Sequence, residues 1–390
     1  MNDERLRERL RDAPVPDERE AEKRSWRVVQ SAYDRRQPLP RRRPRLRLAL
    51  VPAAVALLAL AVATSGTAIG DWLRDITHPG RQHARPALSS LPGRGRLLVT
   101  SPSGPWVVKA DGSKRLLGSY EEASWSPHGL FVVAARGRQL VATDPKGRVR
   151  WTLARPTPIT GPRWSPSGYR IAYLSAGALR VVAGDGTGDR NLIRSVARTP
   201  AAWKPGAGHV LAYAARDGSV HVVGADTRRR LWRSRPGPVP HELAWSADGE
   251  RLAARARSAV RIFDARGRLL RTLRTAAATL RFAPSGHRFA LARSPGLAGQ
   301  SEVALIEDAG RPRPLFVGAG ALTDLAWSPD GRWLLIGWPS ADQWVFVRTE
   351  GGRKVMAVSN VGRQFTPGGR GNAPFPTVDG WCCAPRGPAG

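Results

Sequence analysis

Residues 326–331 read AWSPDG, and five related phrases occur elsewhere in the chain, each an aromatic residue followed by a turn that contains Gly and, in most copies, Pro. The other phrases are SWSPHG from Ser124, RWSPSG from Arg163, AWKPGAG from Ala202, AWSADG from Ala244 and RFAPSG from Arg281. The aromatic anchors, which are the candidate structural residues of the repeat, are Trp125, Trp164, Trp203, Trp245, Phe282 and Trp327. Their spacing of about 40 residues accommodates four short strands and their turns, so each unit is predicted to form one blade of a β-propeller.

The runs between the anchors have the pattern of short strands. RIAYLS from Arg170 and LRVVAGDG from Leu179 are apolar and end near Gly-containing turns, which is typical of β-hairpins. Before the first anchor, RLLVTSPSG, PWVVKADG and KRLLGSY supply three strands of a blade that lacks its first strand. Beyond the last anchor, QFTPGGR from Gln364 offers a degraded seventh anchor, Phe365. We predict that the strand at Phe365 completes the early blade, so that an all-β ring closes with seven blades and few exposed edges.

The repeated phrase WSPDG, followed by an apolar strand and then by a strand ending in Asp and Gly, resembles the TolB-like, WD40-like family of β-propellers. The resemblance covers about residues 94–370. It implies an envelope or secreted propeller that serves as a scaffold for protein contact or as an appendage of a hydrolase. The phrases AWKPGAG, AWSADG and RFAPSG depart from the family pattern because the Pro or the Asp is replaced.

Residues 48–70 carry no charge and predict a single transmembrane helix, because about 20 apolar residues at a rise of about 1.5 Å cross the hydrocarbon core of a bilayer. Five arginines precede this segment: Arg41, Arg42, Arg43, Arg45 and Arg47. Positive charge marks the cytoplasmic side. We therefore expect a single-pass protein of the plasma membrane, with its N-terminus in the cytoplasm and its propeller outside. A cleavable signal peptide, suggested by the spacing of Ala61 and Ala63, is the alternative.

The predicted organisation has five parts. They are a basic cytoplasmic stub (1–47), the transmembrane helix (48–70), a linker (71–93), the propeller (94–370) and a C-terminal tail (371–390). Within the stub, a short helix would place Trp26, Val29 and Tyr33 on one narrow apolar stripe. This stripe is a candidate docking site for a cytoplasmic regulator, and the alternative is a solvated stub whose arginines only orient the membrane segment.

No catalytic, metal-binding or cofactor-binding residues are predicted. None of the seven His residues has the i, i+4 spacing with Glu that zinc hydrolases use, and no G-x-S-x-G elbow occurs. Runs that end at Trp151 and Trp232 faintly resemble the docking repeats of quinoprotein propellers, but their irregular spacing favours interblade packing. The adjacent Cys382 and Cys383 form a vicinal disulfide, cross-link two chains, or belong to a dispensable tail.

The net charge of +31 does not predict a nucleic-acid partner, since the arginines are spread through the turns of the repeats and no aromatic and basic motif accompanies them. The sequence predicts a non-enzymatic, membrane-anchored scaffold whose propeller face binds protein, peptide or cell-wall polymer, because interblade loops gather on two faces around a funnel. A transmembrane sensor that docks a cytoplasmic regulatory protein is the alternative. An enzyme of the propeller hydrolase or quinoprotein type is a third hypothesis.

Overall fold

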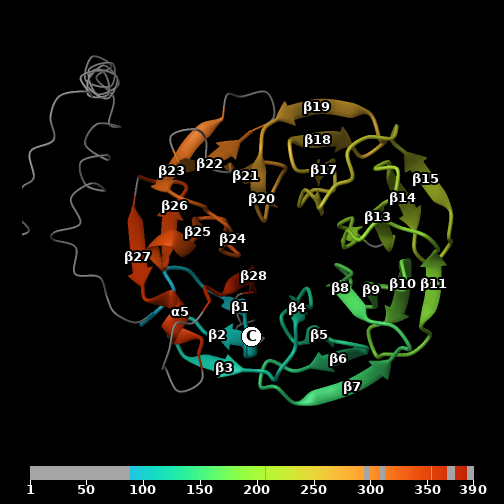
Figure 1. Ribbon diagram of the computed structural model, residues 1–390, viewed down its shortest axis with the longest axis horizontal. Helices are drawn as coiled ribbons and strands as arrows, with labels where there is room; N and C mark the ends of the chain where they lie inside the picture. Colours follow the sequence, from blue (N-terminus) through green and yellow to red (C-terminus); the bar gives the residue numbers. More distant parts are fainter. Residues whose placement is uncertain are drawn as a thin grey trace, which may run out of the picture. The chain divides into compact units, whose positions relative to one another are not determined.

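Four-stranded antiparallel sheets make up nearly all of the described chain. The computed structural model describes residues 88–206, 208–293, 299–307, 312–352, 354–366 and 374–383. Within these ranges, 28 strands form seven sheets, arranged as blades around a central opening (Figure 1). This arrangement confirms the prediction of an all-β, seven-bladed propeller.

Six of the blades are built from four consecutive strands, the first of which is the innermost. Blade 2 contains β4 (Glu122–Trp125), β5 (Val132–Arg136), β6 (Gln139–Thr143) and β7 (Val149–Ala154). Blade 3 contains β8 (Ile159–Trp164), β9 (Arg170–Ser175), β10 (Ala178–Ala183) and β11 (Arg190–Ile193). Blade 4 contains β12 (Ala202–Trp203), β13 (Val210–Ala214), β14 (Val220–Gly224) and β15 (Arg230–Arg233).

The second half of the ring continues in the same way. Blade 5 contains β16 (Glu242–Trp245), β17 (Arg251–Arg255), β18 (Ala259–Asp264) and β19 (Leu269–Arg274). Blade 6 contains β20 (Ala277–Phe282), β21 (Phe289–Arg293), β22 (Gln300–Ile306) and β23 (Arg313–Ala319). Blade 7 contains β24 (Leu325–Trp327), β25 (Trp333–Trp338), β26 (Gln343–Arg348) and β27 (Val355–Ser359), with the 3-10 turn η1 (Pro339–Ala341) inside it and the helix α5 (Val361–Gln364) after it.

Blade 1 joins the two ends of the propeller. Its strands, in order, are β28 (Thr377–Cys382), β1 (Arg96–Ser101), β2 (Gly104–Val108) and β3 (Lys114–Leu116). The last strand of the chain is thus the innermost strand of the first blade, antiparallel to β1, with Trp381 opposite Leu97. The Trp381 indole also donates a hydrogen bond to the Arg94 carbonyl at 3.0 Å, across 287 residues of sequence.

Phe365 is not the anchor of the closing strand, so this part of the prediction was wrong. Asn360 takes a left-handed conformation (φ 56°) and α5 follows it, which leaves Phe365 at the end of a helical turn rather than on a strand. Its side chain is buried beside Trp344, with the ring centroids 5.2 Å apart. The closing strand, Thr377–Cys382, lies within residues 371–390, which the sequence analysis assigned to a tail beyond Phe365.

The hydrophobic core is distributed between neighbouring blades. Val133 and Leu140 of blade 2 share one cluster with Ile171 and Tyr173 of blade 3, and all four side chains are fully buried. A sheet that is packed on both faces needs apolar side chains on both faces, which explains the continuous apolar runs of the second and third strands. Each blade therefore depends on its neighbours for its stability.

The predicted transmembrane helix at 48–70 and the stripe of Trp26, Val29 and Tyr33 lie outside the described residues. In the part of the chain that the structure describes, no helix is long and apolar enough to cross a membrane. Membrane anchoring and cytoplasmic docking therefore stay predictions.

Candidate functional site

The six aromatic anchors lie in six different blades and do not converge on one site. Each is the last residue of the innermost strand of its blade. Trp203 donates its indole N–H to the Arg163 carbonyl at 3.0 Å, and Trp327 donates to the Arg281 carbonyl at the same distance. Both acceptors belong to the preceding blade, so these anchors hold adjacent blades together.

Trp151 and Trp232 also connect neighbouring blades. The indole of Trp151 donates to the Gly184 carbonyl at 2.9 Å, and that of Trp232 donates to the Ala265 carbonyl at 3.1 Å. A Cβ atom added at Gly186 would lie only 2.8 Å from the Trp151 ring, so the turn of blade 3 fits closely against blade 2. These contacts confirm interblade packing as the role of the two tryptophans.

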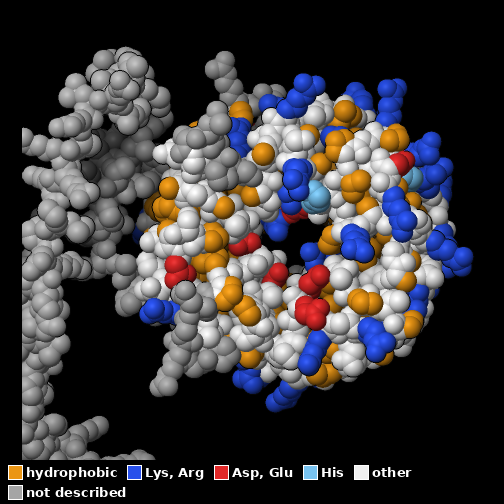
Figure 2. Space-filling view, in the orientation of Figure 1, with side chains coloured by type: hydrophobic (Ala, Val, Ile, Leu, Met, Phe, Trp, Pro, Cys, Tyr) orange, Lys and Arg blue, Asp and Glu red, His pale blue; other side chains and the backbone are white. Residues whose placement is uncertain are grey.

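Charged residues on or next to the innermost strands meet near the axis of the ring. They are Arg163, Arg281, Glu122, Glu242, Asp324 and Asp379. Arg163 of blade 3 interacts electrostatically with charged residues from blades 1, 2, 5 and 6, which only a position near the axis allows. Figure 2 shows both acidic and basic side chains beside the central opening, and further Lys and Arg side chains over the outer rim.

Glu242 is the most strongly partnered carboxylate of this channel. It accepts a hydrogen bond from Arg255 Nε at 2.8 Å and another from Arg281. Burial alone would raise the pKa of Glu242, but the Arg281 and Arg255 guanidiniums outweigh burial and hold the pKa below its usual value. Glu242 therefore stays ionised and binds two arginines to the inner wall.

Asp379 and Asp324 behave in the opposite way. The Asp379 side chain is exposed to the central opening, but the inner strands that surround it limit its solvation and raise its pKa to about 7, although the Thr100 hydroxyl at 2.6 Å and the Arg163 charge oppose the rise. Burial likewise raises the pKa of Asp324 to about 6. Near neutral pH, Asp379 exchanges between its neutral and ionised forms, so the charge of the channel depends on pH.

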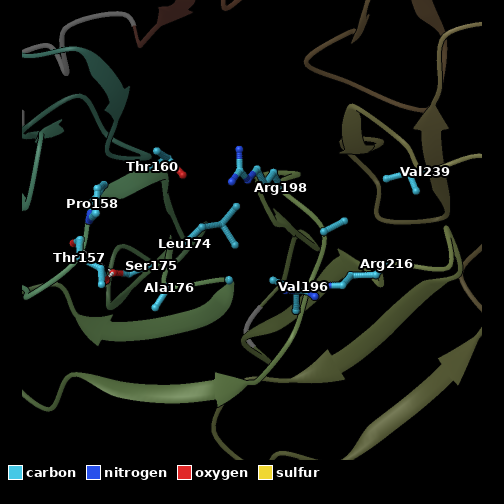
Figure 3. Close-up of a pocket in the computed structure, with 12 residues that line it drawn as sticks. Thr157, Pro158, Thr160, Leu174, Ser175, Ala176, Val196, Arg198, Arg216 and Val239 are labelled. Atoms are coloured by element: carbon cyan, nitrogen blue, oxygen red, sulfur yellow. Dashed lines mark hydrogen bonds between the residues drawn. The ribbon is translucent and has the colours of Figure 1, made fainter.

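A pocket of about 930 Å³ lies between blades 3 and 4 (Figure 3). Thr160 of β8 and Leu174 of β9 line one side, and Val196 from the β11–β12 loop lines the other. Leu174 and Val196 are buried, whereas Val239 at the rim is 39% exposed. This volume is within the usual range for small-ligand and peptide-anchor pockets.

Hydrogen bonds to both neighbouring elements hold the β11–β12 loop in place. The Val196 N–H donates to the Gly177 carbonyl in the β9–β10 turn at 2.8 Å. The Thr199 hydroxyl donates to the Pro240 carbonyl in the β15–β16 loop at 2.5 Å. The pocket is therefore formed before any ligand binds.

Two arginines point into this pocket, as Figure 3 shows. Arg198 comes from the β11–β12 loop and Arg216 from the β13–β14 turn, and both are exposed. A Cβ atom built at Gly177 would lie 3.3 Å from Arg216 Nη2, so this guanidinium lies over the β9–β10 turn. Within the described residues neither guanidinium has a hydrogen-bond or ion-pair partner, and no Asp or Glu lines the pocket.

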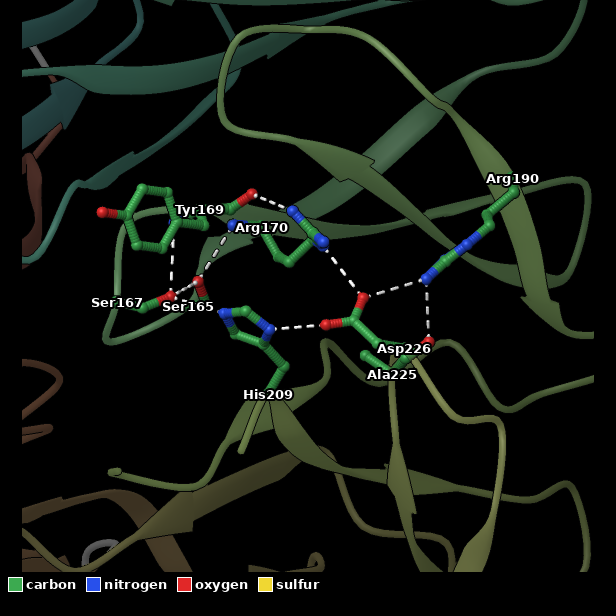
Figure 4. A network of polar contacts seen from close by, with 8 residues as sticks. All are labelled: Ser165, Ser167, Tyr169, Arg170, Arg190, His209, Ala225 and Asp226. Carbon is green, nitrogen blue, oxygen red and sulfur yellow. Dashed lines mark hydrogen bonds and ion pairs between the residues drawn. The ribbon is translucent and has the colours of Figure 1, made fainter. Parts of the chain in front are cut away.

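A polar network connects blades 3 and 4 through the turns that follow the anchors (Figure 4). Ser167 Oγ lies 2.8 Å from His209 Nε2, and His209 Nδ1 lies 2.6 Å from Asp226 Oδ2. Arg170 and Arg190 pair with the other Asp226 oxygen at 3.0 and 3.1 Å. The first two distances match a serine nucleophile, its base and the group that orients the base.

The repeat favours a structural role for this network. Asp248 stands three residues after the Trp245 anchor, the same position that Ser167 has after its own anchor, and it binds His287 Nδ1 of the next blade at 2.8 Å. The same contact between consecutive blades thus recurs without a serine. We interpret both contacts as structural links between consecutive blades, and refer to the Ser167–His209–Asp226 contacts as the latch.

Cys382 and Cys383 form a disulfide at the end of the closing strand. The Cys383 sulfur lies 3.2 Å from the Pro127 carbonyl, in the anchor turn of blade 2. The pair therefore packs against the neighbouring blade. Elsewhere in the described ranges, no group of three or more His, Cys, Asp or Glu residues is placed to hold a metal ion.

The channel, the interblade pocket and the pocket arginines were not singled out from the sequence. Their residues lie far apart in the chain and meet only when consecutive blades stack. The available signal was the presence of charged residues in or beside strands that end in an anchor, as in RWSPSG and RFAPSG.

These features define a WD40-like β-propeller, a fold that generally mediates protein interactions. The family model "WD domain, G-beta repeat" (WD40) matches residues 311–347, which include β23 of blade 6 and β24 and β25 of blade 7. No curated protein matches the chain.

Two solved structures are similar to the chain in fold. Kuenenia stuttgartiensis hydrazine synthase is 16% identical, with 58% of this chain and 75% of that chain covered and a TM-score of 0.48. The Myceliophteria thermophila Cps50 (Swd1) β-propeller domain is also 16% identical, with 61% and 85% covered and a TM-score of 0.47.

Proposed function

We propose that this protein is a non-enzymatic, TolB-like propeller that is anchored in the plasma membrane and binds a protein, peptide or cell-wall ligand on the envelope side. The binding role is carried by one observation, the preformed pocket between blades 3 and 4, into which two unpaired arginines point. The anchoring is supported by the uncharged segment 48–70 and by the arginines that precede it.

A cross-linked pull-down of the full-length protein from its own membranes tests the binding role. The matched comparison is a variant that lacks residues 1–36 but keeps the arginines next to the membrane segment. We expect envelope partners to be recovered equally well with both proteins. Loss of all envelope partners from the full-length sample would contradict the proposal.

Protease protection in parallel tests the orientation. Protease added outside intact cells should remove the propeller and leave the N-terminal stub protected, because the positive flank stays in the cytoplasm. A propeller that is released in soluble form without protease would instead indicate cleavage after the apolar segment.

The proposal also predicts that the purified protein has no turnover on ester, peptide or glycoside substrates. Ser167→Ala serves as the control, because Ser167 and His209 have the geometry of a nucleophile and its base. Hydrolysis that disappears in this variant would identify an enzyme and would refute the latch interpretation.

A transmembrane sensor remains the second candidate, supported by the helical spacing of Trp26, Val29 and Tyr33. It predicts that Trp26→Ala loses a cytoplasmic partner while the melting temperature is unchanged. Ser31→Ala, on the opposite side of the expected helix, is the matched control. Unchanged partner recovery with Trp26→Ala would count against this function.

A further inference from the structure

We infer that the pocket between blades 3 and 4 binds an acidic, extended peptide segment of a partner protein, with a carboxylate held by Arg198 and Arg216. The inference rests on the proposed binding function and specifies the chemistry of its ligand. It follows from the charge around the pocket, the shape of its floor and the rigidity of its walls.

The charge of the surrounding loops favours an anion. The loops at 194–201, 215–219 and 234–241 contain four arginines and one carboxylate, Asp217. Asp217 Oδ1 accepts hydrogen bonds from the Ser219 N–H at 2.9 Å and from the Ser219 hydroxyl at 2.6 Å, which ties this oxygen to its own turn. Those bonds hold its pKa below the usual value, so it remains an ionised acceptor bound to its own turn. The four arginines outnumber the one carboxylate of these described loops, so this surface keeps an excess of positive charge.

The geometry of the two arginines favours a carboxylate. Both line the pocket, Arg198 from the loop that joins blades 3 and 4 and Arg216 from a turn of blade 4 (Figure 3). A planar guanidinium presents paired N–H donors that match the two oxygens of a carboxylate, and such charge-assisted hydrogen bonds are among the strongest in proteins. A ligand that bridges the two arginines would also bridge the two blades.

The floor of the pocket favours a peptide rather than a simple anion. Leu174 and Val196 form a buried apolar surface below the arginines, and Val239 offers an exposed apolar side chain at the rim. An acidic residue next to an apolar residue in an extended segment would satisfy both features. Because hydrogen bonds already fix the β11–β12 loop, little ordering of the protein opposes binding.

The test is selection of a phage-displayed random dodecapeptide library on the full-length protein, followed by affinity measurement with the enriched peptides. We expect enrichment of sequences that combine Asp or Glu with an apolar neighbour. The double variant R198Q/R216Q should bind these peptides at least tenfold more weakly. The matched control R194Q/R235Q removes the same number of charges from the surrounding loops but outside the pocket lining, and should change the affinity less than twofold.

A second pair of variants tests the pocket without removing an arginine. Val239→Glu places a carboxylate at the rim, where it should pair with the arginines and weaken peptide binding about tenfold, whereas Val239→Gln should have less than a twofold effect. Val239 is partly exposed, so both variants should fold, and their melting temperatures check this.

The possible outcomes separate the inference from the proposed function. Enriched peptides that are not acidic, or that bind R198Q/R216Q as well as the parent, would overturn the inference and leave the binding function intact. Binding of dextran sulfate that is lost in R198Q/R216Q, with no peptide enriched, would overturn the peptide assignment in favour of an anionic polymer. Failure to select peptides, together with loss of all partners in the membrane pull-down, would overturn both.

Discussion

Removal of the closing strand should destroy the cooperative unfolding of the whole propeller. The decisive variant ends at Pro376, so that it loses β28 but retains α5 and Phe365. The control ends at Cys383 and loses only residues 384–390. If the sequence-based assignment of Phe365 as the closing anchor were right, both variants would unfold like the full chain.

The magnitude follows from what β28 contributes. Only 8% of the Trp381 surface is exposed to solvent. Its ring packs edge-on against Phe346, with the ring centroids 5.7 Å apart, and its indole N–H donates the hydrogen bond to the Arg94 carbonyl. Val378 is 99% buried. Loss of a buried Trp costs about 3–5 kcal/mol and burial of a Val side chain contributes about 1.5–3 kcal/mol, so the two together supply about 5–8 kcal/mol. The free energy of unfolding of a domain is only about 5–15 kcal/mol, so removal of β28 takes away most of this free energy.

Differential scanning calorimetry of the purified proteins measures this effect. The variant that ends at Cys383 should keep the melting temperature and unfolding enthalpy of the full chain, and the variant that ends at Pro376 should show no cooperative transition. Trp381→Ala removes one side chain of β28 instead of the whole strand, and should lower the melting temperature by about 6–10 °C. A Pro376-terminated protein with the parent's melting temperature and enthalpy would refute closure through β28.

Three further predictions concern the packing, the channel and the latch. Gly186→Ala should lower the free energy of unfolding, measured by urea titration, by about 2–4 kcal/mol, because its Cβ would lie 2.8 Å from the Trp151 ring. The control Gly188→Ala has a similar positive φ but open space around its Cβ, and should lower the same free energy by about 1–2 kcal/mol. Asp379→Asn should flatten the pH dependence of stability between about pH 4 and 7. The native Asp379 pKa of about 7 lies above the unfolded value of 3.8, so this carboxyl stabilises the fold fully below about pH 4 and loses the effect as the pH rises through about 7. A D379N protein whose thermal midpoint varies with pH like the parent's would contradict this assignment. Asp226→Asn should cost about 1–2 kcal/mol in urea titration, because one carboxylate pairs there with three side chains, and an unchanged midpoint would count against the latch.

The sequence predicted the blade count because the repeat is local. A blade of about 40 residues contains its own strands and turns, and an aromatic anchor followed by Pro and Gly marks the start of each unit. The three strands before Trp125 correctly indicated a blade that needs a strand from elsewhere in the chain. The donor of that strand was misplaced at Phe365, because Trp381 lacks the anchor's turn and stands 54 residues after Trp327 instead of about 40.

The sequence by itself determined that the chain forms a seven-bladed ring, because hydrophobic periodicity and turn chemistry act over a few residues at a time. Only the tertiary structure decided which segment closes the ring, since the pairing of β28 with β1 places Trp381 opposite Leu97, at the other end of the propeller sequence. The same holds for the binding pocket. Arg198 and Arg216 are ordinary loop arginines in the sequence, and they line one cavity because blades 3 and 4 stack, with no Asp or Glu among the described residues that line it.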